Sequence, residues 1–351
     1  MSPSARTLLP ALLAIAALAG CLGGGDDASS GNGGNGGGLL PIETGLCVQG
    51  TGGPPAPPGE EVVGVQPVDL IFGGSLRHAN TRVLLVPPGH GDLGEPMNMS
   101  RSALSYLAAT LEGIFSWEPA IDHFIANHTE FAYLDNVTVQ VEVFEQEVPE
   151  TAGYDIIIGY AETSGPVFRG IAIDPDDDAV DLQGQLDQAG LGDVAHLGNR
   201  YVLLSLFASA PRSGQGLPDY PETPEVRGVT MHEFAHVWGL GHSTTWTFGC
   251  GSDLMNSPYA YVYGDGDPAG DGGERSRPLC ISSLDLYGLA YLYRWMPNGT
   301  WEGSAGNASL PPTMVYEEYC VHEEAAARAE AYLAERGLEV PPTVSRLTDL
   351  A

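Results

Sequence analysis

Lysine is absent from this chain of 351 residues, in which all 14 basic residues are arginine and 45 residues are acidic. The formal net charge of −31 argues against nucleic-acid binding, because a surface that binds phosphates needs a basic patch. A large excess of carboxylates keeps a protein soluble by self-repulsion. We therefore interpret the acidity as a means of solvation rather than as a site for a cationic partner.

Long hydrophobic runs are scarce as well. The run "LLPALLAIAALAG", which follows Arg6, is too short for a comfortable membrane span and has the length of a signal-peptide core. It ends in "LAGC" at Cys21, which resembles a lipobox, where the peptide is cut before a cysteine that then carries lipid. The alternative is a plain secretory signal with an incidental cysteine.

The glycine-rich sequence after Cys21 is typical of a flexible tether. We predict a signal peptide over residues 1–20 and a lipid anchor and tether over residues 21–62. The protein is then exported and held on the outer side of the cytoplasmic membrane.

Cysteine is rare, with five residues in the chain. Without Cys21, four remain: Cys47, Cys250, Cys280 and Cys320. An even number in an exported chain suggests two disulfides, and four cysteines allow three pairings. We favour Cys250 with Cys280, which closes a short loop, and therefore Cys47 with Cys320.

The spacing of apolar residues along the chain predicts the helices and strands. Strand patterns occupy residues 81–88, 137–145, 154–162, 167–173 and 200–208. Helical patterns occupy residues 100–117, 223–239, 282–295 and 322–337. This order predicts an α/β (α+β) fold with about five strands, helices packed on the sheet, and a loop-rich C-terminal part.

The stretch "MHEFAHVWGLGH" (231–242) carries the strongest functional signal. His232 and His236 are four residues apart and therefore share one face of a helix. Gly239 permits a left-handed turn that ends the helix, so that His242 returns as a third ligand. Three neutral imidazoles leave one position open, as in a catalytic zinc site. From its position beside the first ligand, Glu233 can take a proton from water at the metal.

"HEFAHVWGLGH" resembles the metzincin signature His-Glu-x-x-His-x-x-Gly-x-x-His at every defined position. The resemblance implies a Met-turn beneath the zinc, and "SDLMNSP" (252–258) supplies Met255. Ser243 after the third histidine, the phrase "LM-x-x-P" and the helix 282–295 are similar to the matrixin group.

The resemblance covers roughly residues 75–296. It implies a metzincin-like zincin, with a twisted, mainly parallel sheet, an active-site helix, a loop-rich C-terminal subdomain with a C-terminal helix, and one catalytic Zn²⁺. We assign residues 63–320 to this domain and residues 321–351 to a helical tail.

Three departures from related groups matter. Ser257 stands where astacins and serralysins have a tyrosine, so no tyrosine ligand is expected. Only Cys250 closely follows His242, so a second zinc of the archaemetzincin kind is not expected. The matrixin cysteine switch is absent, and Cys47 is the only thiol between the anchor and the domain.

Other features carry weaker signals. Tyr259 and Tyr261 follow the Met-turn and are candidates for a substrate pocket or for ordinary packing. Two acidic stretches, 174–181 and 263–274, could hold Ca²⁺ or could simply be solvated loops. Histidines outside the motif, among them His322, have no ligand spacing and are interpreted as surface or core residues.

The sequence thus predicts a membrane-anchored zinc endopeptidase that acts as a monomer on a protein or peptide substrate. The substrate would pair with the strand 167–173 by strand addition. The alternative is a catalytically idle, zinc-containing surface lipoprotein that binds peptides or acts in adhesion.

Overall fold

The computed structural model describes residues 65–70, 76, 78–87, 101–144, 153–161, 170–173, 184, 186–187, 191–205, 223–243, 245–247, 251–255, 279–297, 299 and 306–338. The predicted signal peptide and tether, both acidic stretches, and Cys21, Cys47, Cys250, Tyr259 and Tyr261 lie outside these residues. Among the described residues, no helix is long and apolar enough to cross a membrane.

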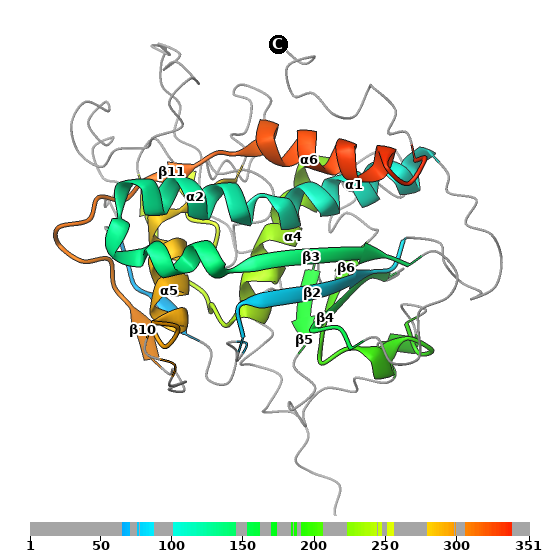
Figure 1. Ribbon diagram of the computed structural model, residues 1–351, viewed down its shortest axis with the longest axis horizontal. Coiled ribbons are helices and arrows are strands. Elements are labelled where there is room, and N and C mark those ends of the chain that lie inside the picture. Colours follow the sequence, from blue (N-terminus) through cyan, green and yellow to red (C-terminus); the bar gives the residue numbers. More distant parts are fainter. Residues whose placement is uncertain are drawn as a thin grey trace, which may run out of the picture.

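A five-stranded sheet forms the centre of the fold (Figure 1). Its strands lie in the order β3 (Thr138–Val143), β2 (Asn80–Leu85), β4 (Ile156–Ala161), β6 (Arg200–Ser205) and β5 (Gly170–Ile173). The first four are parallel, and β5 runs antiparallel to β6 at one edge. The predicted mixed fold with a mainly parallel sheet of five strands is therefore confirmed.

The continuous apolar runs of the central strands reflect burial of both sheet faces. Ile156 and Ile158 of β4 point into the larger core, whereas Ile157 between them points into a second core on the opposite face. Leu84 of β2 and Leu203 of β6 join Ile157 in that second core. Strands buried on both faces lose the apolar–polar alternation of half-buried strands, which explains the sequence pattern.

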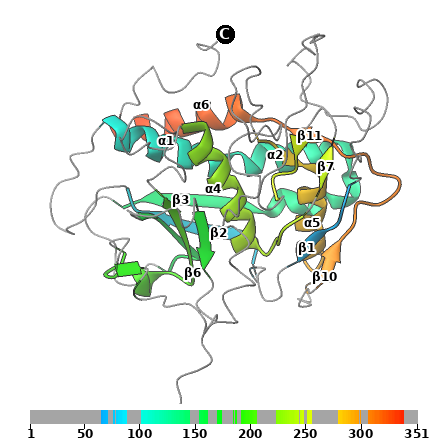
Figure 2. The ribbon, with the colours of Figure 1, turned by 180° about the vertical axis from the view of Figure 1, so that it is seen from behind.

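Helices cover the face with the larger core (Figures 1 and 2). They are α1 (Arg101–Phe115), α2 (Trp117–Asn127), α4 (Thr223–Trp238), α5 (Ser283–Tyr293) and α6 (His322–Ala334), with the 3-10 helix η3 (Thr129–Asn136). The 3-10 helix η4 (Ala195–Leu197) instead packs into the second core on the opposite face. Helix α1 packs against α4 and α6, and α4 packs against β5 and β6. This packing places α4 beside the antiparallel edge of the sheet.

The predicted helix 100–117 is only part of the helical segment. Helix α1 ends at Phe115, and a second helix, α2, begins at Trp117. Between them, the Ser116 hydroxyl donates to the Glu112 carbonyl over 2.7 Å, which satisfies one carbonyl at the end of α1. Pro119 has no backbone N–H to donate. It is tolerated because it lies in the first turn of α2, where N–H groups lack partners within the helix.

Short strands pair antiparallel around the helices. The pairs are β1 (Val68–Leu70) with β10 (Gly306–Ala308), β7 (Trp246–Thr247) with β8 (Gly251–Ser252), and β9 (Ile281–Ser282) with β11 (Glu318–Tyr319). The first and third pairs join segments that lie far apart in the sequence, whereas β7 and β8 form a local hairpin.

The favoured cysteine pairings are wrong, because Cys280 forms a disulfide with Cys320. In the β9–β11 pair, Ile281 is opposite Tyr319, so the preceding Cys280 lies opposite the following Cys320. Their Cα atoms are 4.8 Å apart, which suits a disulfide. Strand pairing over 40 residues, rather than short loop length, therefore selects the partner.

Helix α6 contacts the rest of the fold along its length. Arg328 forms an ion pair with Glu118 of α2, and the Tyr332 hydroxyl donates to the Val141 carbonyl of β3 over 2.8 Å. The segment assigned to a helical tail thus lies against the sheet and the first helices.

Candidate metal centre

Helix α4 carries the first two histidines, and its remaining surface is held in the core. Trp238 is fully buried, stacks edge-on against Trp117 of α2, and donates from Nε1 to the Thr81 hydroxyl of β2 over 2.9 Å. Arg200 of β6 donates to the Val237 carbonyl in the last turn. These contacts fix the rotation of α4 and hence the direction of His232 and His236.

The turn after α4 brings the third histidine back, as predicted. Gly239 has a φ of 111°, a conformation that strongly favours glycine. The chain then runs beside β1, where Gly241 N–H donates to the Asp69 carbonyl (2.7 Å) and Asp69 N–H donates to the His242 carbonyl (2.9 Å). A Cβ on Gly241 would lie 2.8 Å from the Asp69 Cβ. Glycine therefore permits the close approach that holds His242.

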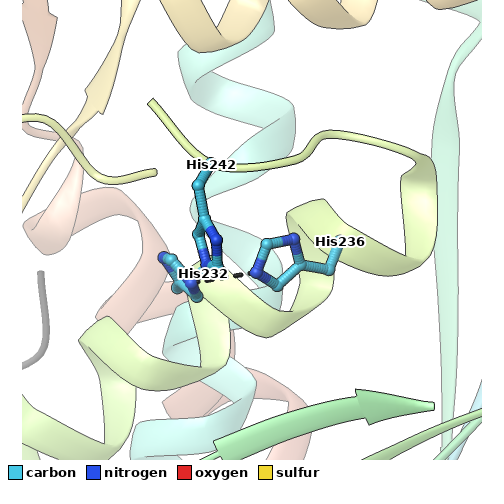
Figure 3. Close-up of side chains that lie close together, drawn as sticks. All are labelled: His232, His236 and His242. Carbon is cyan, nitrogen blue, oxygen red and sulfur yellow. Dashed lines mark hydrogen bonds between the residues drawn. The ribbon is translucent and has the colours of Figure 1, made fainter. Parts of the chain in front are cut away.

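The three imidazoles converge on one point (Figure 3). His232 and His236 project from neighbouring turns of α4, and His242 reaches back toward them from the following segment. One ligand atom from each lies within 4.8 Å of the other two. The predicted histidine set is therefore brought together.

Hydrogen bonds on the far side of two rings fix which nitrogens face that point. His232 Nδ1 lies 2.7 Å from the Leu254 carbonyl oxygen, and His236 Nδ1 lies 2.7 Å from the Leu240 carbonyl oxygen. A carbonyl only accepts, so each Nδ1 carries the proton. Each Nε2 is then unprotonated and carries a lone pair. Histidines that bind metals are commonly oriented in this way, with the other ring nitrogen donating to a carbonyl.

These lone pairs supply a test of whether the residues fit a metal ion. His232 Nε2 and His236 Nε2 are only 3.0 Å apart, yet neither neutral ring has a proton to place between them. Two nitrogens about 2.0–2.1 Å from a tetrahedral zinc would be about 3.3 Å apart. A cation between the rings would turn this repulsive approach into coordination, so the residues fit a zinc ion.

Electrostatics keep the rings neutral. Burial, and next the neighbouring His242, lower the pKa of His232 to about 3. Burial likewise places the pKa of His236 well below its usual value. Burial also lowers the pKa of His242, although the charge of Asp69 acts in the opposite direction. Neutral imidazole is the form that binds metal.

Glu233 belongs to α4, and its side chain lies against the edge strand β5. Its side chain is 1% exposed, and burial raises the pKa of its carboxyl to about 8, against a hydrogen bond from the Ala172 backbone N–H. A Cβ on Gly170 would lie 2.6 Å from Glu233 Cγ and 2.9 Å from Oε1. Glycine at position 170 thus makes room for the carboxylate, a feature that the sequence analysis missed.

Met255 lies at the end of an antiparallel hairpin that begins directly after His242. Ser243 N–H donates to the Met255 carbonyl over 2.7 Å, and Asp253 N–H donates to the Thr245 carbonyl over 3.2 Å. Strands β7 and β8 continue the same register. Met255 is fully buried. The carbonyl of the preceding Leu254 accepts the hydrogen bond from His232 Nδ1. The predicted Met-turn residue is therefore buried, and it directly follows the residue whose carbonyl holds His232.

A second group of possible ligands consists of Cys280, Cys320 and His322. His322 Nε2 is 3.7 Å from Cys280 Sγ, a proximity that no sequence spacing had indicated. The two sulfurs are joined in the disulfide and so are not thiolate ligands. Of the two groups found among the described residues, the three-histidine group is therefore the better candidate for a metal site.

Comparison with known proteins gives no match: no family model, no curated protein and no solved structure is similar enough to place the chain in a family.

Proposed function

We propose that this chain is an exported, lipid-anchored zinc endopeptidase of the metzincin type. The observation that supports this proposal most strongly is the convergence of three neutral imidazoles. Backbone carbonyls hold two of them in the metal-binding tautomer. Bound there, a zinc ion supplies a Lewis acid that polarises a peptide carbonyl and lowers the pKa of water. His232, His236 and His242 would hold it and leave one position open.

The presence of Glu233 favours a catalytic role for the metal over a purely structural one. A structural site needs no buried carboxylate beside its first ligand, whereas hydrolysis needs a base. The Glu233 carboxylate would accept a proton from the attacking water and later deliver it to the leaving amine. The position of Glu233 against β5 supports a proton transfer beside a sheet edge.

The edge strand offers a way to position a substrate. In the described part of the sheet, β5 pairs with β6 alone, and α4 packs beside it. An extended peptide could add to the outer edge of β5 through backbone hydrogen bonds. Its scissile carbonyl would then lie near Glu233. This geometry favours a protein or peptide substrate over a small molecule.

The test compares the wild type with Glu233→Ala, both without residues 1–22. Zinc per chain is measured by elemental analysis, and cleavage is measured on a mixed peptide library. The proposal predicts one zinc in both proteins and cleavage by the wild type alone. If both bind zinc and neither cuts, even after N-terminal trimming, the peptidase proposal fails and an idle zinc lipoprotein takes its place.

A further inference from the structure

A buried carboxylate, Asp253, joins the two segments that support the metal centre. Its Oδ2 accepts from the Ser243 hydroxyl over 2.9 Å and from the Met255 backbone N–H over 3.2 Å. Asp253 is 1% exposed and Ser243 is 2% exposed. One oxygen atom therefore ties the residue after His242 to the Met-turn, across the hairpin that they share.

The second oxygen of Asp253 is held from far along the chain. Tyr316 donates its hydroxyl proton to Asp253 Oδ1 over 2.8 Å, and both side chains are buried. Burial, and next the charge of Asp253, hold the pKa of Tyr316 well above its usual value. The tyrosine thus stays a donor at neutral pH. A buried hydrogen bond to a charged acceptor is among the stronger kinds.

The backbone on either side of Tyr316 is fixed by Ser283, the first residue of α5. The Ser283 hydroxyl donates to the Val315 carbonyl over 3.0 Å and accepts from Glu317 N–H over 3.0 Å. Ser283 N–H donates to the Glu317 carbonyl over 2.8 Å. The disulfide between Cys280 and Cys320 closes the same pair of segments. The ring of Tyr316 is therefore aimed by contacts on both sides.

We propose that Tyr316 and Asp253 are positioning residues of the metal centre, through which the C-terminal segment fixes the spacing between the His242 loop and the Met-turn. This inference rests on the proposed function. It assigns a role in the site to a segment that lies about 60 residues beyond Met255. The Met-turn in turn orients His232 through the Leu254 carbonyl, so that the pair acts on ligands at both ends of the hairpin.

The test uses the full-length protein in detergent and the variant Tyr316→Phe, which removes one hydroxyl and keeps the ring. Tyr319→Phe is the matched control, because the Tyr319 hydroxyl donates to Glu317 (3.1 Å) in the same segment, apart from Asp253. Zinc affinity is measured by competition with a chelator, and peptide cleavage is resolved into kcat and KM. Circular dichroism verifies that both variants fold.

We expect Tyr316→Phe to weaken zinc binding about tenfold, the lower range for loss of an outer-shell partner, and to lower kcat with little change in KM. Tyr319→Phe should stay within about twofold of the wild type. Equal zinc affinity and kcat in the two variants would overturn the proposal. The zinc measurement decides even if the wild type cuts no peptide, so failure of the proposed function is distinguished from failure of this inference.

A double-variant cycle tests whether the two residues act as a unit. Asp253→Asn keeps the size of the side chain and removes its charge. Residues that act through one hydrogen bond give non-additive effects. The double variant Asp253→Asn/Tyr316→Phe should therefore bind zinc about as weakly as Asp253→Asn alone. Multiplied effects of the two single changes would show that Tyr316 does not act through Asp253.

Discussion

Gly170→Ala should impair catalysis without removing the metal ligands. A Cβ at this position would lie 2.5 Å from Val229 Cγ1 and 2.6 Å from Glu233 Cγ, whereas carbon atoms pack at about 3.5–4.0 Å. The shortfall is about 1 Å, so either β5 or the Glu233 side chain must move by about that distance. Overpacking of this kind costs about 1–3 kcal/mol of stability, and a misplacement of about 1 Å can lower a rate about 10²-fold.

The assay measures zinc content, thermal unfolding and kcat for peptide cleavage. Gly153→Ala is the matched control, because a Cβ there would meet no atom within 4 Å. We expect Gly170→Ala to bind one zinc and to lose about 10²-fold in kcat, and Gly153→Ala to match the wild type. A Gly170→Ala variant with one zinc and an unchanged kcat would refute the placement of Glu233 against β5.

Three further predictions concern stability and assembly. Deletion of residues 1–64 should preserve zinc binding, whereas deletion of residues 1–75 should abolish it, because only the longer deletion removes the strand that holds the His242 loop; equal zinc content in both would contradict that role. Burial, and next the charge of Asp253, raise the pKa of Asp285 well above its usual value, so the unfolding free energy of the metal-free wild type should fall as pH rises from about 4 toward the folded pKa. Asp285→Asn should show a shallower fall in urea titrations, and an identical slope would exclude this proton uptake. Reduction of the disulfide between Cys280 and Cys320, which closes a loop of 40 residues, should cost about 4 kcal/mol, and mass mapping that finds another pairing would refute the assignment.

Much of the fold follows from local pattern. The apolar runs of β4 and β6 and the alternation of β3 predicted strands correctly, because burial on one or two faces leaves a direct trace in the sequence. The helix that carries His232 and His236, and the glycine that ends it, were also predicted. Helical spacing and left-handed turns depend only on residues that are close in the sequence. The capping box of Ser282 and Asp285 likewise marks the start of α5.

The remaining features depend on long-range contacts. Cys280 meets Cys320 because β9 pairs with β11, and loop length carries no information about that pairing. Asp253 is one of many acidic residues in the chain, and only the fold reveals that Tyr316 lies against it. Gly170 has no turn signal, because its small size matters only once β5 lies against Glu233. Such contacts are set by tertiary packing, which local spacing does not encode.

The most direct test of the central claim is X-ray absorption at the zinc edge of the zinc-loaded protein. The proposed centre predicts three imidazole nitrogens and one oxygen, at about 2.0–2.1 Å. The same spectrum of His242→Ala should lose one nitrogen. A spectrum of the wild type with sulfur at about 2.3 Å would place the metal at Cys280 and Cys320, and would contradict the three-histidine site and the activity proposed for it.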